Sequence, residues 1–242
     1  MHTIGKLFKG IILNLSDEKF EKFVFHSHKT DLSPIHQEFL NAEKKTNIKN
    51  ITLSKNFQKS INEITQENLD IVFFPDIGMS SEFYYLSFIR FAKIQITSWG
   101  HPITTSNDTI DYFLSSKLLE TKDAHKRFSE KLILSDYLPM YFYKPKIKNI
   151  LPEKEIVKKN VYFCSQNLMK IHPHFDEIVG KILTKDKKSK IFFIKDKKEI
   201  MSKKLLKRFE KNTLIDLNRV TFFEKMGVED YINTCGSSSV LL

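Results

Sequence analysis

The stretch that decides the fold is Leu69–Trp99, LDIVFFPDIGMSSEFYYLSFIRFAKIQITSW. It opens with the apolar run LDIVFFPD and closes with KIQITSW, and each run has the length of a strand. Between them SSEFYYLSFIRFA predicts a helix, capped by Ser80 or Ser81. We therefore expect a buried strand, a helix and a second strand, the repeating unit of a parallel sheet.

The same alternation extends on both sides of this stretch. A helix is predicted from Thr3, a plausible N-cap, because apolar residues recur there at helical spacing. Later strands are predicted at TIDYFLSS and KLILSD. Alternating helices and apolar strands predict an α/β fold with a doubly wound parallel sheet covered on both faces.

The alternation is interrupted once, at Tyr137–Asn160, which carries three prolines and much charge. It restarts with the strand NVYFCS, followed by a helix that has Pro173 in its first turn. We read the interruption as a linker and expect two domains, residues 1–150 and 151–242.

The alternation of strands and helices is incomplete at both ends of the chain. The chain begins on a helix without a preceding strand and stops on the apolar strand SSVLL. We expect a piece of a larger protein, with the first strand of one domain missing and the second domain truncated.

The composition limits the classes of protein to which the chain can belong. The chain has 242 residues, is 41% hydrophobic and carries a net charge of +10. No apolar run reaches the roughly 20 residues of a membrane helix. Cys164 and Cys235 lack metal-like spacing and predict buried thiols in a reducing, cytoplasmic compartment. The charge fits either a solvated basic surface or a phosphate-bearing or acidic partner.

Two candidate site residues follow strands. His101 lies after KIQITSW, between Gly100 and Pro102, in a loop whose Thr104 and Thr105 suit sugar hydroxyls or phosphate oxygens. A polar turn with an incidental histidine explains this loop equally well.

Lys170 follows NVYFCS and precedes a helix, a position that suits a pyrophosphate. A plain surface lysine is the alternative. His2, beside the first helix, has the chemistry of a general base but no partner in the sequence pattern.

Five stretches in order resemble the O-linked N-acetylglucosamine transferase family, in particular its bacterial SPINDLY-like branch. They are HTIGKLFKGII, LDIVFFPDIGM, RFAKIQITSWGHPITTSNDTIDYFLSSKLLE, FSEKLILSDYLP and YFCSQNLMKIHPHFDEIVGKIL. Together they run from His2 to Leu183, and the tail RVTFFEKMGVEDYINTCGSSSVLL continues them more weakly.

The resemblance implies a GT-B fold of two Rossmann-like domains, with residues 1–150 as the catalytic half and residues 151–242 as the start of the nucleotide-sugar-binding half. It implies transfer of N-acetylglucosamine from UDP-GlcNAc to a protein serine or threonine, without cofactor or metal. His2 and His101 would be catalytic. The donor-binding residues would be Lys170, Gln166, Asn167, Pro102, Thr105 and, by a weaker match, Tyr231.

Further expectations follow from the family pattern. The family carries TPR repeats upstream, and a glycine-rich donor loop should follow Leu242, so the chain alone is expected to be inactive. A cytoplasmic protein is implied, with neither nucleic acid nor membrane as partner. Two alternatives stay open: a UDP-glucose-dependent protein N-glucosyltransferase of the adhesin-modifying type, and a non-catalytic polyanion-binding module.

Overall fold

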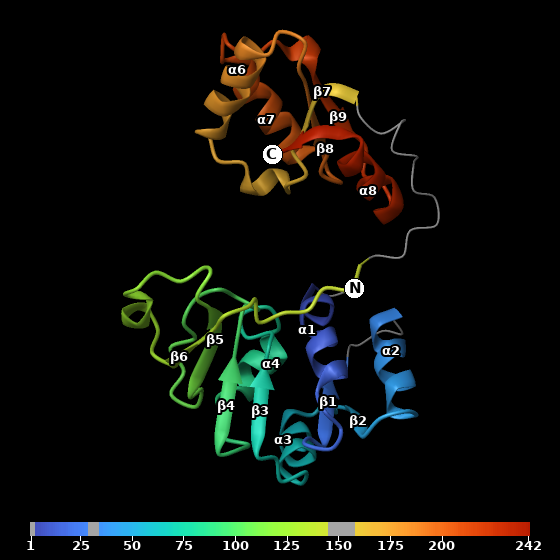
Figure 1. The fold of residues 1–242 in the computed structure, drawn as a ribbon, viewed down its shortest axis with the longest axis vertical. Helices are drawn as coiled ribbons and strands as arrows, with labels where there is room; N and C mark the ends of the chain where they lie inside the picture. The colour runs from blue at the N-terminus through green and yellow to red at the C-terminus, as the bar shows by residue number, and fades with distance from the viewer. Residues whose placement is uncertain (1–2, 29–33, 145–157) are drawn as a thin grey trace. The chain divides into compact units, whose positions relative to one another are not determined.

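The computed structural model describes residues 3–28, 34–144 and 158–242. The chain forms two compact units, Met1–Lys144 and Pro145–Leu242 (Figure 1). Residues 145–157, which make up most of the predicted linker, lie outside the described part.

The first unit alternates helices and strands as the sequence predicts. Its elements are α1 (Thr3–Asn14), β1 (Lys22–His26), α2 (Pro34–Glu43), β2 (Ile48–Thr52), α3 (Phe57–Thr65), β3 (Ile71–Phe74), α4 (Ser81–Leu86), β4 (Ile94–Thr97), β5 (Tyr112–Ser116), the 3₁₀ turn η1 (Ala124–Arg127) and β6 (Lys131–Ser135). Thr3 is the first residue of α1 rather than its N-cap.

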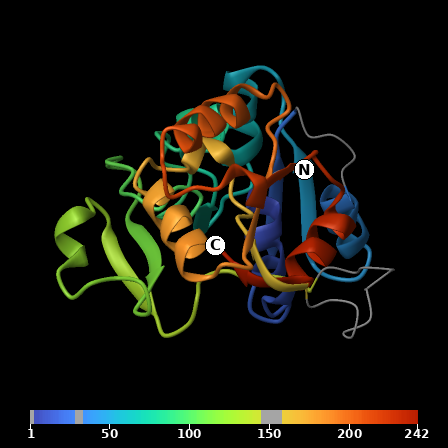
Figure 2. The same ribbon diagram turned by 90° about the horizontal axis from the view of Figure 1, so that it is seen from above.

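The sheet of this unit is parallel, as predicted. β3, β4, β5 and β6 pair in that order, and β1 and β2 form a separate parallel pair. Figures 1 and 2 show this pair on the β3 side of the unit and β6 on the opposite flank. The prediction that β3 is buried is only partly right, because β3 is an edge strand of its sheet and Ile71 is 48% exposed.

The helix predicted over residues 80–92 is cut short at Leu86. Ser80 caps its N-terminus by accepting a hydrogen bond from the Phe83 N–H, so the start is as predicted. Beyond it the buried Gln95 side chain accepts from the Phe91 N–H at 2.8 Å and donates to the Ile89 carbonyl at 3.2 Å. These bonds satisfy backbone groups that a longer helix would have paired internally.

A segment after β6, residues 137–144, returns to the first helix, and we call it the strap. The Tyr141 N–H donates to the Leu7 carbonyl at 2.9 Å, and Asn14 donates to the Tyr143 hydroxyl at 3.0 Å. A Cβ at Gly10 would lie 2.4 Å from the Tyr141 ring, so glycine permits this close approach. The strap thus joins the last part of the unit to α1.

The second unit repeats the architecture. Its elements are β7 (Lys158–Phe163), the 3₁₀ turn η2 (Leu168–Lys170), α6 (Phe175–Lys185), β8 (Lys190–Ile194), α7 (Ile200–Glu210), the 3₁₀ turn η3 (Leu217–Arg219), β9 (Val220–Phe223), α8 (Val228–Gly236) and β10 (Ser238–Leu241). The strands form one parallel sheet in the order β10-β7-β8-β9. Pro173 precedes α6 instead of lying in its first turn, and His174 is the N-cap residue.

The second unit has its own hydrophobic core, built where α6 and α7 cover the sheet. Val179 and Leu183 of α6, Ile191 and Phe193 of β8, and Phe209 of α7 are all fully buried. Cys164 is buried as predicted, whereas Cys235 is only partly buried, and both thiols are free. Within the described residues no helix is long and apolar enough to cross a membrane.

Candidate functional site

The His101 loop is fixed by a contact between two turns. A Cβ at Gly100 would lie 2.0 Å from the Pro75 carbonyl oxygen, so the turn after β4 touches the turn after β3 and only glycine fits there. Gly78 has φ +86°, and a Cβ on it would lie 3.0 Å from the His101 Cβ. The exposed His101 therefore rests on the neighbouring turn at the carboxyl end of the sheet.

The two threonines of this loop are held by Glu130, which is 4% exposed. The Thr104 hydroxyl donates to Glu130 Oε2 at 2.8 Å. The Thr105 N–H donates to Oε1 at 2.7 Å, and the Thr105 hydroxyl donates to the same oxygen. Burial alone would raise the pKa of Glu130, but these hydrogen bonds outweigh it and hold the pKa below its usual value.

These bonds limit what the loop offers a ligand. The N–H and the hydroxyl proton of Thr105 are both directed at Glu130, so Thr105 shapes the loop. Asn107 is buried and donates to the Ser87 carbonyl at 3.1 Å. His101 and Pro102 remain the exposed candidates of this loop.

Glu130 is a residue that the sequence analysis did not select. It lies 25 positions from Thr105, on the residue before β6, and only the fold brings the two together. The signal that could have found it is the Ser-Glu pair within FSEKLILSDYLP, one of the five family-like stretches.

In the second unit the donor-site candidates gather at the carboxyl end of β7. Asn167 caps η2 by accepting from the Met169 N–H at 3.0 Å, and Gln166 accepts from the Asn167 N–H at 2.9 Å. Lys170 closes this turn, its own N–H donating to the Asn167 carbonyl at 2.9 Å. Its side chain is exposed, and no ion pair joins it to the described residues. Its ammonium is thus open to an anion.

The helix that follows Lys170 does not supply an open anion site. Its first turn carries Asp176 and Glu177, which already complement the positive end of the helix dipole. Arg208 of α7 binds Asp176 through two nitrogens, at 2.9 and 2.6 Å. The attraction of Lys170 for a phosphate therefore depends on its own ammonium and on the turn at η2.

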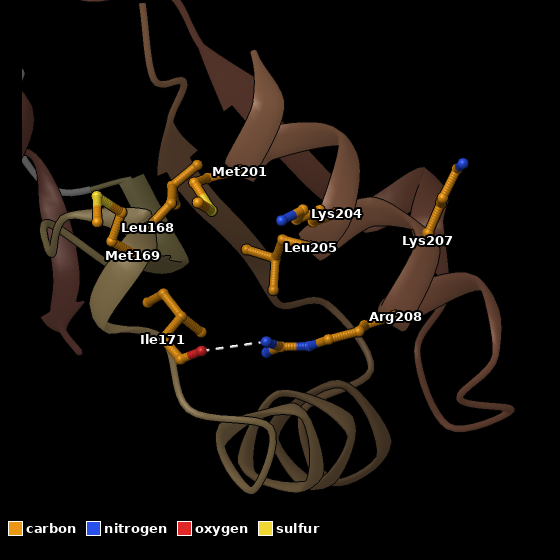
Figure 3. Close-up of a pocket in the computed structure, with 8 residues that line it drawn as sticks. All are labelled: Leu168, Met169, Ile171, Met201, Lys204, Leu205, Lys207 and Arg208. Carbon is orange, nitrogen blue, oxygen red and sulfur yellow. Dashed lines mark hydrogen bonds between the residues drawn. The ribbon is translucent and has the colours of Figure 1, made fainter. Parts of the chain in front are cut away.

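Next to this turn is a groove of about 400 Å³ between η2 and α7. Figure 3 shows the residues that line it, with Leu168, Met169 and Ile171 on the η2 side and Met201, Lys204 and Leu205 on α7. Arg208 closes one end by donating to the Ile171 carbonyl at 3.1 Å. Tyr231, on α8, also lies near this strand end, because its ring meets that of Phe163, the last residue of β7, edge to face with a centroid distance of 6.1 Å.

The predicted cleft joins residues of both units. His2 lies outside the described residues, and His101 and Lys170 belong to different units. The grouping of His2, His101 and Lys170 around one donor therefore stays a prediction.

The chain is similar to a solved structure over nearly its whole length and to a curated protein over half of its length. A mutant of the Thermobaculum terrenum O-GlcNAc transferase matches 99% of this chain with a TM-score of 0.84 and 15% sequence identity. A UDP-glucose:protein N-beta-glucosyltransferase from Actinobacillus pleuropneumoniae serotype 5b (strain L20) is 29% identical over 129 residues, 50% of this chain. No protein-family model matches the sequence.

The chain therefore has the α/β fold of a GT-B glycosyltransferase, as the sequence predicted. It spans 20% of the length of the curated relative and 45% of the solved structure. Both proteins that it resembles are named as transferases of a sugar. At the level of fold, the chain is similar to glycosyltransferases.

Proposed function

We propose that this chain is part of a UDP-sugar-dependent protein glycosyltransferase. The observation that carries the proposal is the exposed Lys170 ammonium, on a short capped turn at the carboxyl end of a central strand of the second unit. In open α/β sheets ligands bind at this end of the strands. A diphosphate held there would place its negative charge against the ammonium.

The proposed chemistry is displacement at the sugar C1 with UDP as leaving group. Negative charge grows on the diphosphate as the C1–O bond breaks, so a fixed cation stabilises the transition state more than the ground state. Lys170 would supply that cation, with Gln166 and Asn167 setting the turn. We propose no metal and no cofactor, and place His2 and His101 at the acceptor side of the reaction.

Two donors are candidates. The resemblance of five sequence stretches favours UDP-GlcNAc, with a protein serine or threonine as acceptor. The 29% identity with the N-beta-glucosyltransferase favours UDP-glucose and a nitrogen acceptor. We take UDP-GlcNAc as the first candidate, in a cytoplasmic protein with TPR repeats upstream.

The test uses the protein as its gene encodes it. UDP binding is measured by calorimetry at two salt concentrations, and transfer is assayed with labelled UDP-GlcNAc and UDP-glucose on peptides that carry Ser, Thr or Asn. We expect UDP to bind, Lys170→Ala to weaken that binding, and one of the two sugars to be transferred. The absence of UDP binding, together with DNA binding that falls steeply with salt, would instead indicate a polyanion-binding module.

A further inference from the structure

A second carboxylate lies at the same end of the first sheet as His101. Asp76 is in the turn that follows β3, and its carbonyl accepts from the Met79 N–H at 2.9 Å and from the Ser80 N–H at 3.1 Å. These bonds fix the turn, and Ser80 then caps α4. The Asp76 side chain is partly buried, and its carboxylate has a hydrogen bond from its own backbone N–H.

Glu82, in the first turn of α4, is the charged neighbour of Asp76. Glu82 is itself occupied, because it accepts from the Ser27 hydroxyl and lies 3.3 Å from His28 Nδ1. His101 approaches from the turn after β4, where its Cβ packs on Gly78, two residues beyond Asp76. Four groups from four chain segments, namely Asp76, Glu82, His28 and His101, thus gather where β1, β3 and β4 end.

The two carboxylates at this end of the sheet, Glu130 and Asp76, differ in whether other side chains already hydrogen-bond to their oxygens. Glu130 uses both oxygens on the threonines of the His101 loop. No such side-chain partner holds Asp76 among the described residues. Burial first, and then the negative charge of Glu82, raise the pKa of Asp76 to about 7, against the opposing effect of its backbone N–H. A general base is most effective when its pKa lies near the working pH.

We propose that Asp76 is a catalytic residue of the proposed transfer reaction and acts as the general base. Its carboxylate takes the proton of the acceptor hydroxyl while the acceptor oxygen forms its bond to the sugar C1. The bond between C1 and the UDP oxygen breaks in the same step, and its electron pair leaves on UDP. The protonated Asp76 then returns its proton to solvent. This inference rests on the proposed function.

The neighbours explain why Asp76 is suited to this step. Hydrogen bonds from Ser27 and His28 fix Glu82 in place, so that its charge favours the proton-bearing form of Asp76. The Gly100 backbone lies close to the backbone of Pro75 and Asp76, and the His101 Cβ packs on Gly78, so the turns after β3 and β4 are held together. His101 is then placed to orient the acceptor.

The first experiment observes the proton itself. The 242-residue chain is labelled with ¹³C at the aspartate carboxyls, and the Asp76 resonance is assigned by its loss in Asp76→Asn. We expect a titration midpoint near 7 and a lower midpoint in Glu82→Gln, which removes the neighbouring charge. Asp111, whose pKa is lowered by the hydrogen bond from Arg90, is the internal reference. A midpoint for Asp76 near 4 would overturn the proposal.

The second experiment measures transfer by the protein as its gene encodes it. Asp76→Asn should lower kcat by about 10²-fold or more and remove the acidic limb of the kcat–pH profile, while leaving UDP affinity unchanged. The Trp99 fluorescence of Asp76→Asn controls for folding. Full activity in Asp76→Asn, with transfer by the wild type, would overturn the inference alone. Failure of the wild type to bind UDP and to transfer sugar would overturn the proposed function instead, and this inference with it.

Discussion

The carboxyl ends of the two sheets are organised in opposite ways. In the first unit the loop that carries His101 is hydrogen-bonded to Glu130, and at Gly100 it contacts the turn that follows β3. In the second unit Lys170 ends a three-residue turn, with its ammonium exposed and unpaired within the described chain. In the His101 loop the hydroxyls of Thr104 and Thr105 are bonded to Glu130, whereas the Lys170 ammonium keeps its charge available for a ligand.

This contrast in hydrogen bonding distinguishes residues that hold a site in shape from residues that contact its ligand. A side chain whose hydrogen bonds are made within the protein contributes mainly to stability. A side chain with an unused charge contributes little to stability and gains its role when a ligand arrives. Substitutions at the first sheet should therefore change the free energy of unfolding, and substitutions at Lys170 should not.

The largest loss of stability is expected for Gly100→Ala. The added methyl would meet the Pro75 carbonyl oxygen at 2.0 Å, and the two turns would have to separate. We expect a loss of about 3 kcal/mol, the upper part of the usual range for overpacking. Urea unfolding followed by Trp99 fluorescence measures this, because Trp99 is the only tryptophan and lies in the first unit.

Gly5→Ala is the matched control for Gly100→Ala. Its Cβ would meet only the end of the Ile35 side chain, at 3.1 and 3.6 Å, and alanine favours the helix in which Gly5 lies. The midpoint of the control should shift little. A stable Gly100→Ala protein would show that the turns are not in forced contact.

A smaller loss is expected at Glu130. Glu130→Ala leaves two hydroxyls and an N–H without their acceptor, and we expect about 2–3 kcal/mol, since hydrogen bonds to a charged group are worth about 1.5–3 kcal/mol and are not additive. Glu130→Gln keeps an acceptor and should lose about 1 kcal/mol. Glu18→Gln, at an exposed position of the same unit, should change stability by less than about 0.5 kcal/mol.

The Glu130 difference should also depend on pH. The pKa of Glu130 in the folded protein is below its usual value of 4.5, so its stabilising contribution is present above that pH and is lost as the pH falls through the folded pKa. The stability gap between wild type and Glu130→Gln should therefore narrow below about pH 4.5. A gap that stays constant down to the acid unfolding of the protein would show that the charge of Glu130 is not what the threonines recognise.

The smallest effect on stability is expected for Lys170→Ala, within about 0.5 kcal/mol, because the side chain is exposed. Under the proposed function its effect on transfer should be large, on the order of 10²-fold in kcat, since it would remove the cation that faces the leaving diphosphate in the transition state. Lys187→Ala, also an exposed lysine of the second unit, is the control and should leave both quantities unchanged. Equal losses of activity in both variants would mean that the basic surface acts only in bulk.

Much of the fold could be predicted from local patterns. The period of apolar residues located α1, and the short apolar runs located β4 and β5. The end of α4 could not be found in this way, because it is set by Gln95, which reaches back from the next strand to Ile89 and Phe91. A contact of this kind depends on the tertiary fold and leaves no local period.

The candidate site shows the same limit. His101 and Lys170 stand out in the sequence because each follows a strand. Asp76 also follows a strand, but its burial and its partners, like those of Glu130, are supplied only by the folded sheet. The hydroxyls of Thr104 and Thr105 suggested ligand contacts, but the structure directs them to Glu130.

The strap determines where a pulling force on the chain would act first. It lies along α1 through Tyr141 and Tyr143, and Lys144, its last residue, is where the first unit ends. Tension on the chain beyond Lys144 would first load these two tyrosines and, through them, Leu7 and Asn14 of α1. Such a force would therefore act on the helix directly preceded by His2 before it acts on any strand of the sheet. It would be transmitted where the Tyr141 ring packs on Gly10.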